Sequence, residues 1–287
     1  MLNIYLMKTI IVPTDFSKNA HNAAEYAAQM ALHFGDKILL MHAYEPPVPI
    51  SAYELESLHF EAMQHHVEKR LAEQKDGLLE KFGQNLIIDT VAYNGRLVER
   101  IAELYSQPDA KLAVIGLTGA GMANFFLGSN TLNIVNGVGR TVLTVPPYAP
   151  FKPVKKVVFA FDLWQVQATL PLRRIKRLMG MLSAELIVLN VVQHKQESDE
   201  AWEQEKQKLA DLMAQEEIPY SFHTIKSRKI VSGITEFAKE QQADLIAIVP
   251  RTHDFLGDLL GENHTKTLLF HSGVPILTMP PDNLQGN

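Results

Sequence analysis

The chain has no cysteine, and this absence excludes several kinds of site. Disulfide bonds, thiolate nucleophiles, and zinc or iron–sulfur centres with cysteine ligands all require that side chain. Any chemistry that the protein performs therefore has to use oxygen atoms, imidazole rings or backbone groups.

Long apolar runs and long runs of like charge are also missing. No apolar stretch approaches the ~20 residues that cross a bilayer, and the opening MLNIYLMK is too short for a secretory signal. The net charge of −5 comes from interspersed acids and bases, which leaves no basic face for nucleic acid. We therefore expect a cytoplasmic protein whose partners are neither membranes nor nucleic acids.

Apolar residues are present in the amount that a large core needs. They make up 46% of the 287 residues, and a chain of this length suggests about two domains of ordinary size.

Short apolar strands alternate with helical patterns in the first half of the chain. Ser17 suits the N-cap of the first helix and Gly35 its C-terminal stop. The expected strands are 8–15, 37–44, 86–93, 112–116 and 141–147, and the expected helices are 17–34, 52–82, 97–106 and 130–138. Strands that are apolar on both faces and separated by helices are typical of a parallel sheet covered on both sides. The sequence thus predicts a doubly wound α/β domain.

The same alternation begins again in the second half. Three segments match in order: VKKVVFAFD (154–162) with MKTIIVPTD (7–15), SAELIVLNVV (183–192) with GDKILLMHAY (35–44), and ADLIAIVP (243–250) with AKLAVIGL (110–117). Such ordered matches indicate an internal duplication. The prolines around YAPF form a short stiff linker between the halves. We therefore expect two tandem doubly wound parallel-sheet domains, 1–150 and 151–287.

Four glycines lie in VIGLTGAGMANFFLGSNT (114–131), which begins as a buried strand and ends at a helix-start pattern. Backbone N–H groups, hydroxyls and a helix N-terminus at the carboxyl edge of a sheet can bind an anion such as phosphate. A tight strand-to-helix loop is the alternative interpretation. The segment is neither a Walker loop nor a dinucleotide fingerprint, because it lacks G-x-x-x-x-G-K-[ST] and has Asn124 where the third glycine would be.

The motifs taken together resemble the universal stress protein family, with its adenine-nucleotide alpha-hydrolase-like fold. They are IIVPTDFS (10–17), ILLMHAY (38–44), the G-x-x-G loop, GSNT and the final VLTVPP. The resemblance covers essentially the whole chain as a tandem pair of such domains. One spacing departs from the family pattern, because eight residues, Ala120 to Leu127, separate Gly119 from Gly128 where ATP-binding members have nine.

The resemblance implies an ATP site in the first domain, and a Mg²⁺ ion accompanying the ATP is left open. Asp15 would accept hydrogen bonds from the ribose, Pro13 and Thr14 would line the adenine side, and the Ala43 backbone would pair with the adenine edge. The phosphates would be surrounded by Gly116, Gly119, Gly121, Gly128, Ser129 and Asn130. For Asp15 alone, an Asx turn or a helix N-cap is the alternative.

The second domain departs from this pattern. Gly261 aligns with Gly128, but the counterparts of the other three phosphate glycines carry side chains, namely Val249, Thr252 and Asp254. Glu262 stands where Ser129 would face a phosphate. Asp162 is retained, and we expect it to act locally at the start of the following helix. One ATP site per chain is the expectation.

Nothing near the glycine loop supports fast chemistry. No Lys or Arg occurs within 116–131 to neutralise a transferring phosphate, so we expect at most slow ATP hydrolysis. A nucleotide-regulated module that binds an unknown protein partner in a stress response is the preferred function. A structural protein without nucleotide is one alternative. A metal-dependent hydrolase is the other, and its ligands would come from His253, Asp254, Asp258, Glu262, His264 and His271.

The resemblance also implies how the two domains associate, since single domains of the family commonly pair through their last strands. We expect 141–147 and 275–281 to meet within one molecule as an intramolecular pseudo-dimer, which would cover two sheet edges. A further homodimer of whole chains is left open.

Overall fold

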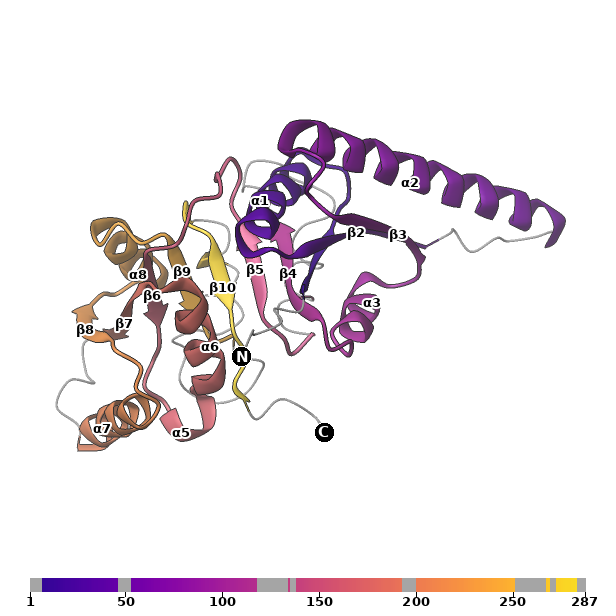
Figure 1. Cartoon of the computed structure of the whole chain (residues 1–287). Coiled ribbons are helices and arrows are strands. Elements are labelled where there is room, and N and C mark those ends of the chain that lie inside the picture. The colour runs from indigo at the N-terminus through magenta and orange to yellow at the C-terminus, as the bar shows by residue number, and fades with distance from the viewer. Residues whose placement is uncertain are drawn as a thin grey trace.

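The computed structural model describes residues 7–45, 53–117, 134, 138–192, 200–250, 267–268 and 272–282, with the helical backbone alone given for 53–60. Strands and helices alternate along both halves as predicted (Figure 1), and most of the expected helix 130–138 lies outside the described residues. The first half contains β1 (Thr9–Pro13), α1 (Lys18–Phe34), β2 (Lys37–Tyr44), α2 (Tyr53–Phe82), β3 (Ile88–Asn94), α3 (Leu97–Leu104), β4 (Ala110–Gly116) and β5 (Val142–Val145). The second half contains β6 (Lys156–Ala160), α5 (Val166–Thr169), α6 (Leu172–Leu182), β7 (Glu185–Val192), α7 (Glu200–Gln215), β8 (Ser221–Lys226), α8 (Ile230–Glu240), β9 (Leu245–Ile248) and β10 (Ile276–Thr278).

Helix α1 begins and ends at the residues that the sequence predicts. The Ser17 hydroxyl accepts a hydrogen bond from the Ala20 amide at 3.2 Å, which satisfies one of the amides that the first turn leaves unpaired. Gly35 adopts the left-handed conformation at φ 70°, and its N–H donates to the Ala31 carbonyl. The buried face consists largely of small side chains, namely Ala20, Ala23, Ala24, Ala27, Ala28 and Ala31. These small side chains allow α1 to pack close to the sheet.

The corresponding segment of the second half is interrupted. α5 ends at Thr169 and α6 begins at Leu172, with Pro171 between them. Proline has no N–H to donate to the preceding turn, so a continuous helix would lose a hydrogen bond and meet a steric clash there. The two halves therefore differ most clearly just after their first strands.

All ten described strands form one sheet, in the order β3-β2-β1-β4-β5-β10-β9-β6-β7-β8. Neighbouring strands are parallel within each half. β5 and β10 pair antiparallel at the centre, with Ile276 opposite Thr144 and Thr278 opposite Val142 (Figure 1). The predicted pairing of the two last strands is thereby confirmed.

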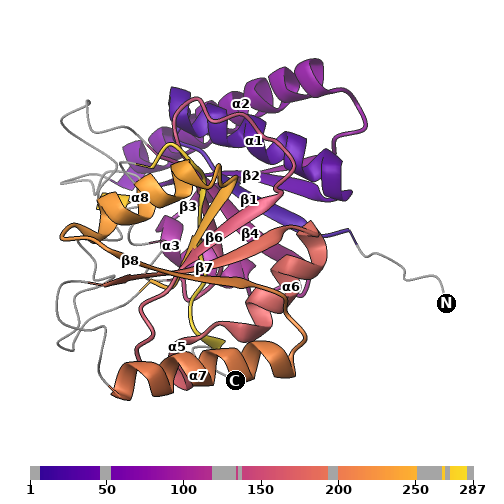
Figure 2. The ribbon, with the colours of Figure 1, turned by 90° about the vertical axis from the view of Figure 1, so that its left-hand side faces the viewer.

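Helices cover both faces of the sheet. Along β1, Ile10 and Val12 belong to one core cluster, whereas Ile11 belongs to the other. The first cluster includes residues of α1 and α2, which lie side by side (Figure 2), and the second includes residues of α3. The predicted fold, two tandem doubly wound α/β units, is confirmed. Among the helices that the structure describes, none combines the length and the apolar character that crossing a bilayer requires.

Two buried threonines join the halves across β5 and β10. Thr144 donates its hydroxyl to the Ile276 carbonyl, and Thr278 donates to the Val142 carbonyl, each at 3.1 Å. Both side chains have no exposed surface. In each pair, the carbonyl oxygen supplies the hydrogen-bond acceptor that water would otherwise provide to the buried hydroxyl.

Replacing both Thr144 and Thr278 with valine should lower the free energy of unfolding by about 2 kcal/mol. Each substitution keeps the side-chain shape and removes one buried hydrogen bond, which contributes about 1 kcal/mol. Urea unfolding of the two single variants and the double variant measures the loss. Thr90→Val, at an exposed position on β3, is the matched control and should change stability by less than about 0.5 kcal/mol. A double variant as stable as this control would contradict the role of the hydroxyls.

Candidate functional site

The carboxyl ends of β1, β2 and β4 lie together at one edge of the first half. β1 is paired with β2 on one side and with β4 on the other. From β1 the chain proceeds to β2 and β3 in one direction, and then returns to β4 and β5 in the other. Open α/β sheets bind ligands at such a reversal of strand order, outside the carboxyl ends of the strands.

Asp15 follows β1 at this edge and its side chain is exposed. Its Oδ1 accepts a hydrogen bond from the Ser17 amide at 2.9 Å, so the Asx turn predicted as an alternative is formed. The intervening Phe16 has the left-handed φ of 62°, which is uncommon for a large side chain. Among the described residues, nothing donates to Asp15 Oδ2. One carboxylate oxygen therefore holds the turn, and the other points to no described donor.

Pro13 and Thr14, the predicted adenine-side residues, are both buried beside this turn. The Thr14 amide donates to the Met41 carbonyl at 2.8 Å. The Thr14 hydroxyl accepts a hydrogen bond from the Phe16 amide and donates one to Gln74 Oε1 of α2, each at 3.0 Å. The Thr14 hydroxyl thus already donates one hydrogen bond and accepts another within the protein.

Ala43 is partly exposed and lies near the end of β2. The register of β1 with β2 ends at Pro13 opposite Met41, so Ala43 lies two residues beyond the last pair. Tyr44 comes next, and its pKa is raised chiefly by burial and further by the charge of Glu68. Its hydroxyl is therefore neutral at physiological pH.

Gly116 ends β4, and the packing of α1 explains why it is glycine. A Cβ at this position would lie 2.3 Å from the Asn19 carbonyl oxygen and 2.6 Å from the Asn19 carbonyl carbon. The first turn of α1 lies directly against the end of β4, and no side chain fits between them. This contact is independent of any ligand, and the predicted role of Gly116 near phosphate stays a prediction.

The remaining predicted phosphate residues lie outside the described residues. These are Gly119, Gly121, Gly128, Ser129 and Asn130. The six predicted ligands of the metal alternative in the second half also lie outside them. Within the part of the chain that the structure describes, no group of three or more His, Asp or Glu side chains could hold a metal ion.

A stack of three side chains beside Asp15 is a feature that the sequence did not reveal. The rings of Phe16 and His42 are stacked with their centroids 4.7 Å apart. The Arg70 guanidinium of α2 lies 4.1 Å from the centre of the Phe16 ring, within the range of a cation–π interaction. His42 Nδ1 also lies 2.6 Å from the Thr14 carbonyl oxygen. These contacts join residues that are distant in sequence, so no local pattern could have predicted them.

The second half repeats the turn at Asp162. Its Oδ1 accepts from the Trp164 amide at 3.2 Å, and the intervening Leu163 has a left-handed φ of 56°. The Trp164 amide precedes α5, while the amide of Val166, the first residue of α5, donates to Glu205 Oε2 of α7 at 2.7 Å. Glu205 thus accepts from the first amide of this helix, and Asp162 accepts from an amide two residues before it.

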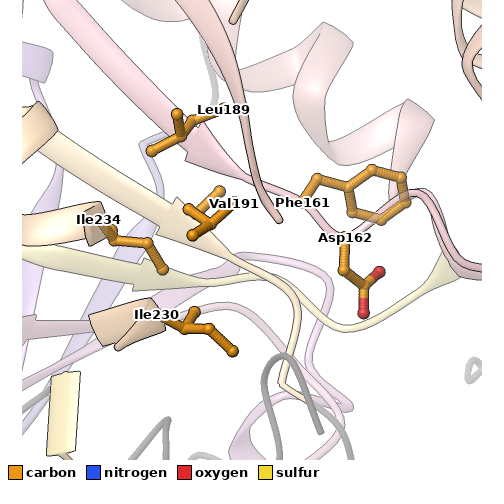
Figure 3. A pocket seen from close by; sticks show the side chains of 7 residues that line it. Phe161, Asp162, Leu189, Val191, Ile230 and Ile234 are labelled. Carbon is orange, nitrogen blue, oxygen red and sulfur yellow. The ribbon is translucent and has the colours of Figure 1, made fainter. Parts of the chain in front are cut away.

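A shallow hollow in the second half occupies the place that corresponds to the predicted nucleotide site of the first (Figure 3). It is lined by Ala160, Phe161, Asp162, Leu189, Val191, Ile230 and Ile234. Its empty volume is about 200 Å³, including the part open to solvent.

Two residues that line this hollow are more buried than their counterparts in the first half. Val191 is the penultimate residue of β7, as Ala43 is of β2, and Ile230 begins α8, as Leu97 begins α3. Val191 is 4% exposed and Ile230 is 3% exposed, whereas Ala43 and Leu97 are partly exposed. The match of 183–192 with 35–44 already placed valine opposite alanine, so this difference could have been found from the sequence.

Comparison with known sequences gives the same family for both halves. The family model described as the universal stress protein family matches residues 7–146 and again residues 153–280. The "universal stress protein in QAH/OAS sulfhydrylase 3'region" of Thermus aquaticus is 30% identical over 142 residues, which are 49% of this chain and 99% of that protein.

Solved structures resemble the chain over nearly its whole length. A universal stress protein from Archaeoglobus fulgidus DSM 4304 has a TM-score of 0.67 at 15% identity, covering 95% of this chain and 98% of that chain. A functionally unknown protein from Pseudomonas aeruginosa PAO1 has a TM-score of 0.57 at 14% identity, covering 96% of this chain and 94% of that chain. At these identities the likeness shows a shared fold.

Proposed function

Because the chain belongs to the universal stress protein family, we propose that its first half binds an adenine nucleotide, ATP, at the carboxyl edge of the sheet. The observation that carries the proposal is the exposed Asp15 carboxylate at the reversal of strand order, with Oδ2 lacking a described donor. A carboxylate oxygen placed in this way can accept hydrogen bonds from ribose hydroxyls.

The neighbouring residues complete the proposed site. The adenine would lie against the surface of Pro13 and Thr14, and its edge would pair with the backbone of Ala43, beyond the last β1 pair. The phosphates would follow towards Gly116 and the glycine-rich segment after it. The hydroxyl of Thr14 is occupied by Phe16 and Gln74, so the adenine side is held by shape and backbone groups.

In the second half we propose no equivalent ATP site. Val191 and Ile230 are buried where Ala43 and Leu97 are partly exposed, and valine is larger than alanine at the position that would pair with the adenine edge. In addition, the sequence of the second half predicts a helix start at Glu262, and this carboxylate would repel a phosphate there. The protein would then act as a regulatory module with one nucleotide site, in which occupancy changes a surface that a protein partner reads.

Titration of ATP into the purified protein should give a stoichiometry near one per chain. Isothermal calorimetry measures the number of sites, and mass spectrometry of ligand released from fresh protein identifies any nucleotide that it carries. Two equivalent sites would contradict the asymmetry of the halves. Zinc in elemental analysis together with no nucleotide binding would instead favour the metal-dependent alternative.

A further inference from the structure

One hydrogen bond recurs in the two halves with different side chains as donors. In the first half His42 Nδ1 lies 2.6 Å from the Thr14 carbonyl oxygen. In the second half Asn190 Nδ2 donates to the Phe161 carbonyl oxygen at 3.0 Å. Each acceptor belongs to the residue directly before the aspartate of the turn. Because a carbonyl can only accept, His42 carries a hydrogen on Nδ1.

This bond completes the attachment of the chain just before Asp15. The Thr14 amide is bonded to the Met41 carbonyl, and the Thr14 carbonyl is bonded to His42, so both backbone groups of Thr14 are tied to β2. β1 itself ends one residue earlier, at Pro13. The His42 side chain therefore extends the hold of β2 on the chain past the last strand residue.

His42 also contacts the residue that follows Asp15. The Phe16 ring stacks on the imidazole at 4.7 Å between centroids, and Arg70 lies on Phe16 at 4.1 Å. Asp15 itself is exposed, and among the described residues its side chain is hydrogen-bonded to Ser17 in the same turn. The residues on both sides of Asp15 are thus held by His42.

We propose that His42 is a positioning residue for the nucleotide site, acting through its hydrogen bond to the Thr14 carbonyl. The inference rests on the proposed function, since it assigns His42 the task of fixing the carboxylate that meets the ribose. A carboxylate that is already fixed loses less conformational freedom when the ligand binds, and binding is correspondingly tighter. We expect this effect on ATP affinity from His42 and not from its counterpart in the second half.

The chain itself supplies the variants that test this idea. Asparagine makes the same bond in the second half, so His42→Asn should keep ATP affinity within about twofold of the unaltered protein, whereas His42→Ala should lower it about fivefold. Asn190→Ala is the matched control, because it removes the equivalent bond and also an acceptor of Trp202 Nε1. It should lower the urea midpoint at least as much as His42→Ala and leave ATP affinity unchanged.

Amide exchange provides a second readout that needs no ligand. The Phe16 and Ser17 amides donate within the Asp15 turn, so His42→Ala should accelerate their hydrogen exchange in NMR, and His42→Asn should not. Unchanged ATP affinity in His42→Ala, or an equal loss in His42→Asn, would overturn the inference while leaving the proposed function intact. Absence of ATP binding by the unaltered protein would overturn the proposed function, whatever the exchange rates show of the turn.

Discussion

Gly116→Ala is expected to lower the free energy of unfolding by about 3 kcal/mol, the largest single effect on stability that we predict. The new Cβ would lie 2.3 Å from the Asn19 carbonyl oxygen, far inside van der Waals contact. The obstacle is backbone in the first turn of α1, so no side-chain rotation relieves it. Either α1 or the end of β4 has to shift, and the contacts of the alanine face of α1 would be strained with it.

A matched control comes from the long helix of the same half. No heavy atom lies within 4 Å of the position that a Cβ would take at Gly77 of α2, which is exposed. Gly77→Ala should therefore stabilise the protein by about 0.5–1 kcal/mol, since alanine restricts the unfolded chain and suits a helix. Urea unfolding of both variants measures the contrast. A Gly116→Ala protein as stable as the unaltered chain would show that α1 does not lie against β4 as described.

Asp15→Ala should weaken ATP binding about tenfold or more, whereas Asp162→Ala should leave it nearly unchanged. If Asp15 meets the ribose, its loss removes a charge-assisted hydrogen bond, which contributes about 1.5–3 kcal/mol. Asp162 occupies the same turn in the second half, but it borders the small apolar hollow. Nucleotide titration of the two variants under identical conditions measures the difference in affinity.

The stability of the same two variants separates the ligand role from the turn role. Each aspartate accepts one backbone amide in an Asx turn, from Ser17 or from Trp164, so each substitution should cost a similar amount, about 0.5–1.5 kcal/mol. Equal losses of ATP affinity would show that the second half also holds nucleotide. A loss of stability in both variants, with affinity unchanged in both, would leave Asp15 as a turn residue alone.

Features that depend on neighbouring residues could be predicted from the sequence. Ser17 and Gly35 mark the ends of α1 because a hydroxyl N-cap and a glycine stop act within one helical turn. The ordered matches between the halves predicted the duplication, and the family resemblance implied the meeting of β5 and β10. The Asx turn at Asp15 could likewise be predicted, because it joins residues that are close in sequence.

Features that depend on distant residues could not be predicted. The reason for glycine at position 116 is the backbone of Asn19, 97 positions away in the sequence, which only the fold brings close. The family resemblance placed Gly116 near phosphate, and its contact with the Asn19 backbone was not visible in the sequence. The equivalence of His42 and Asn190 could not be predicted for another reason. The two residues make the same hydrogen bond, but a comparison of residue types does not match histidine with asparagine.

The antiparallel junction of β5 and β10 has a consequence for how the two halves could diverge. Identical subunits related by a twofold axis carry every substitution twice, so a residue that closes one pocket closes its mate as well. Here the related halves belong to a single chain and meet through Thr144 and Thr278 without being copies. Alanine could therefore be kept at position 43 while valine came to occupy position 191, a combination that no exactly symmetric dimer can hold.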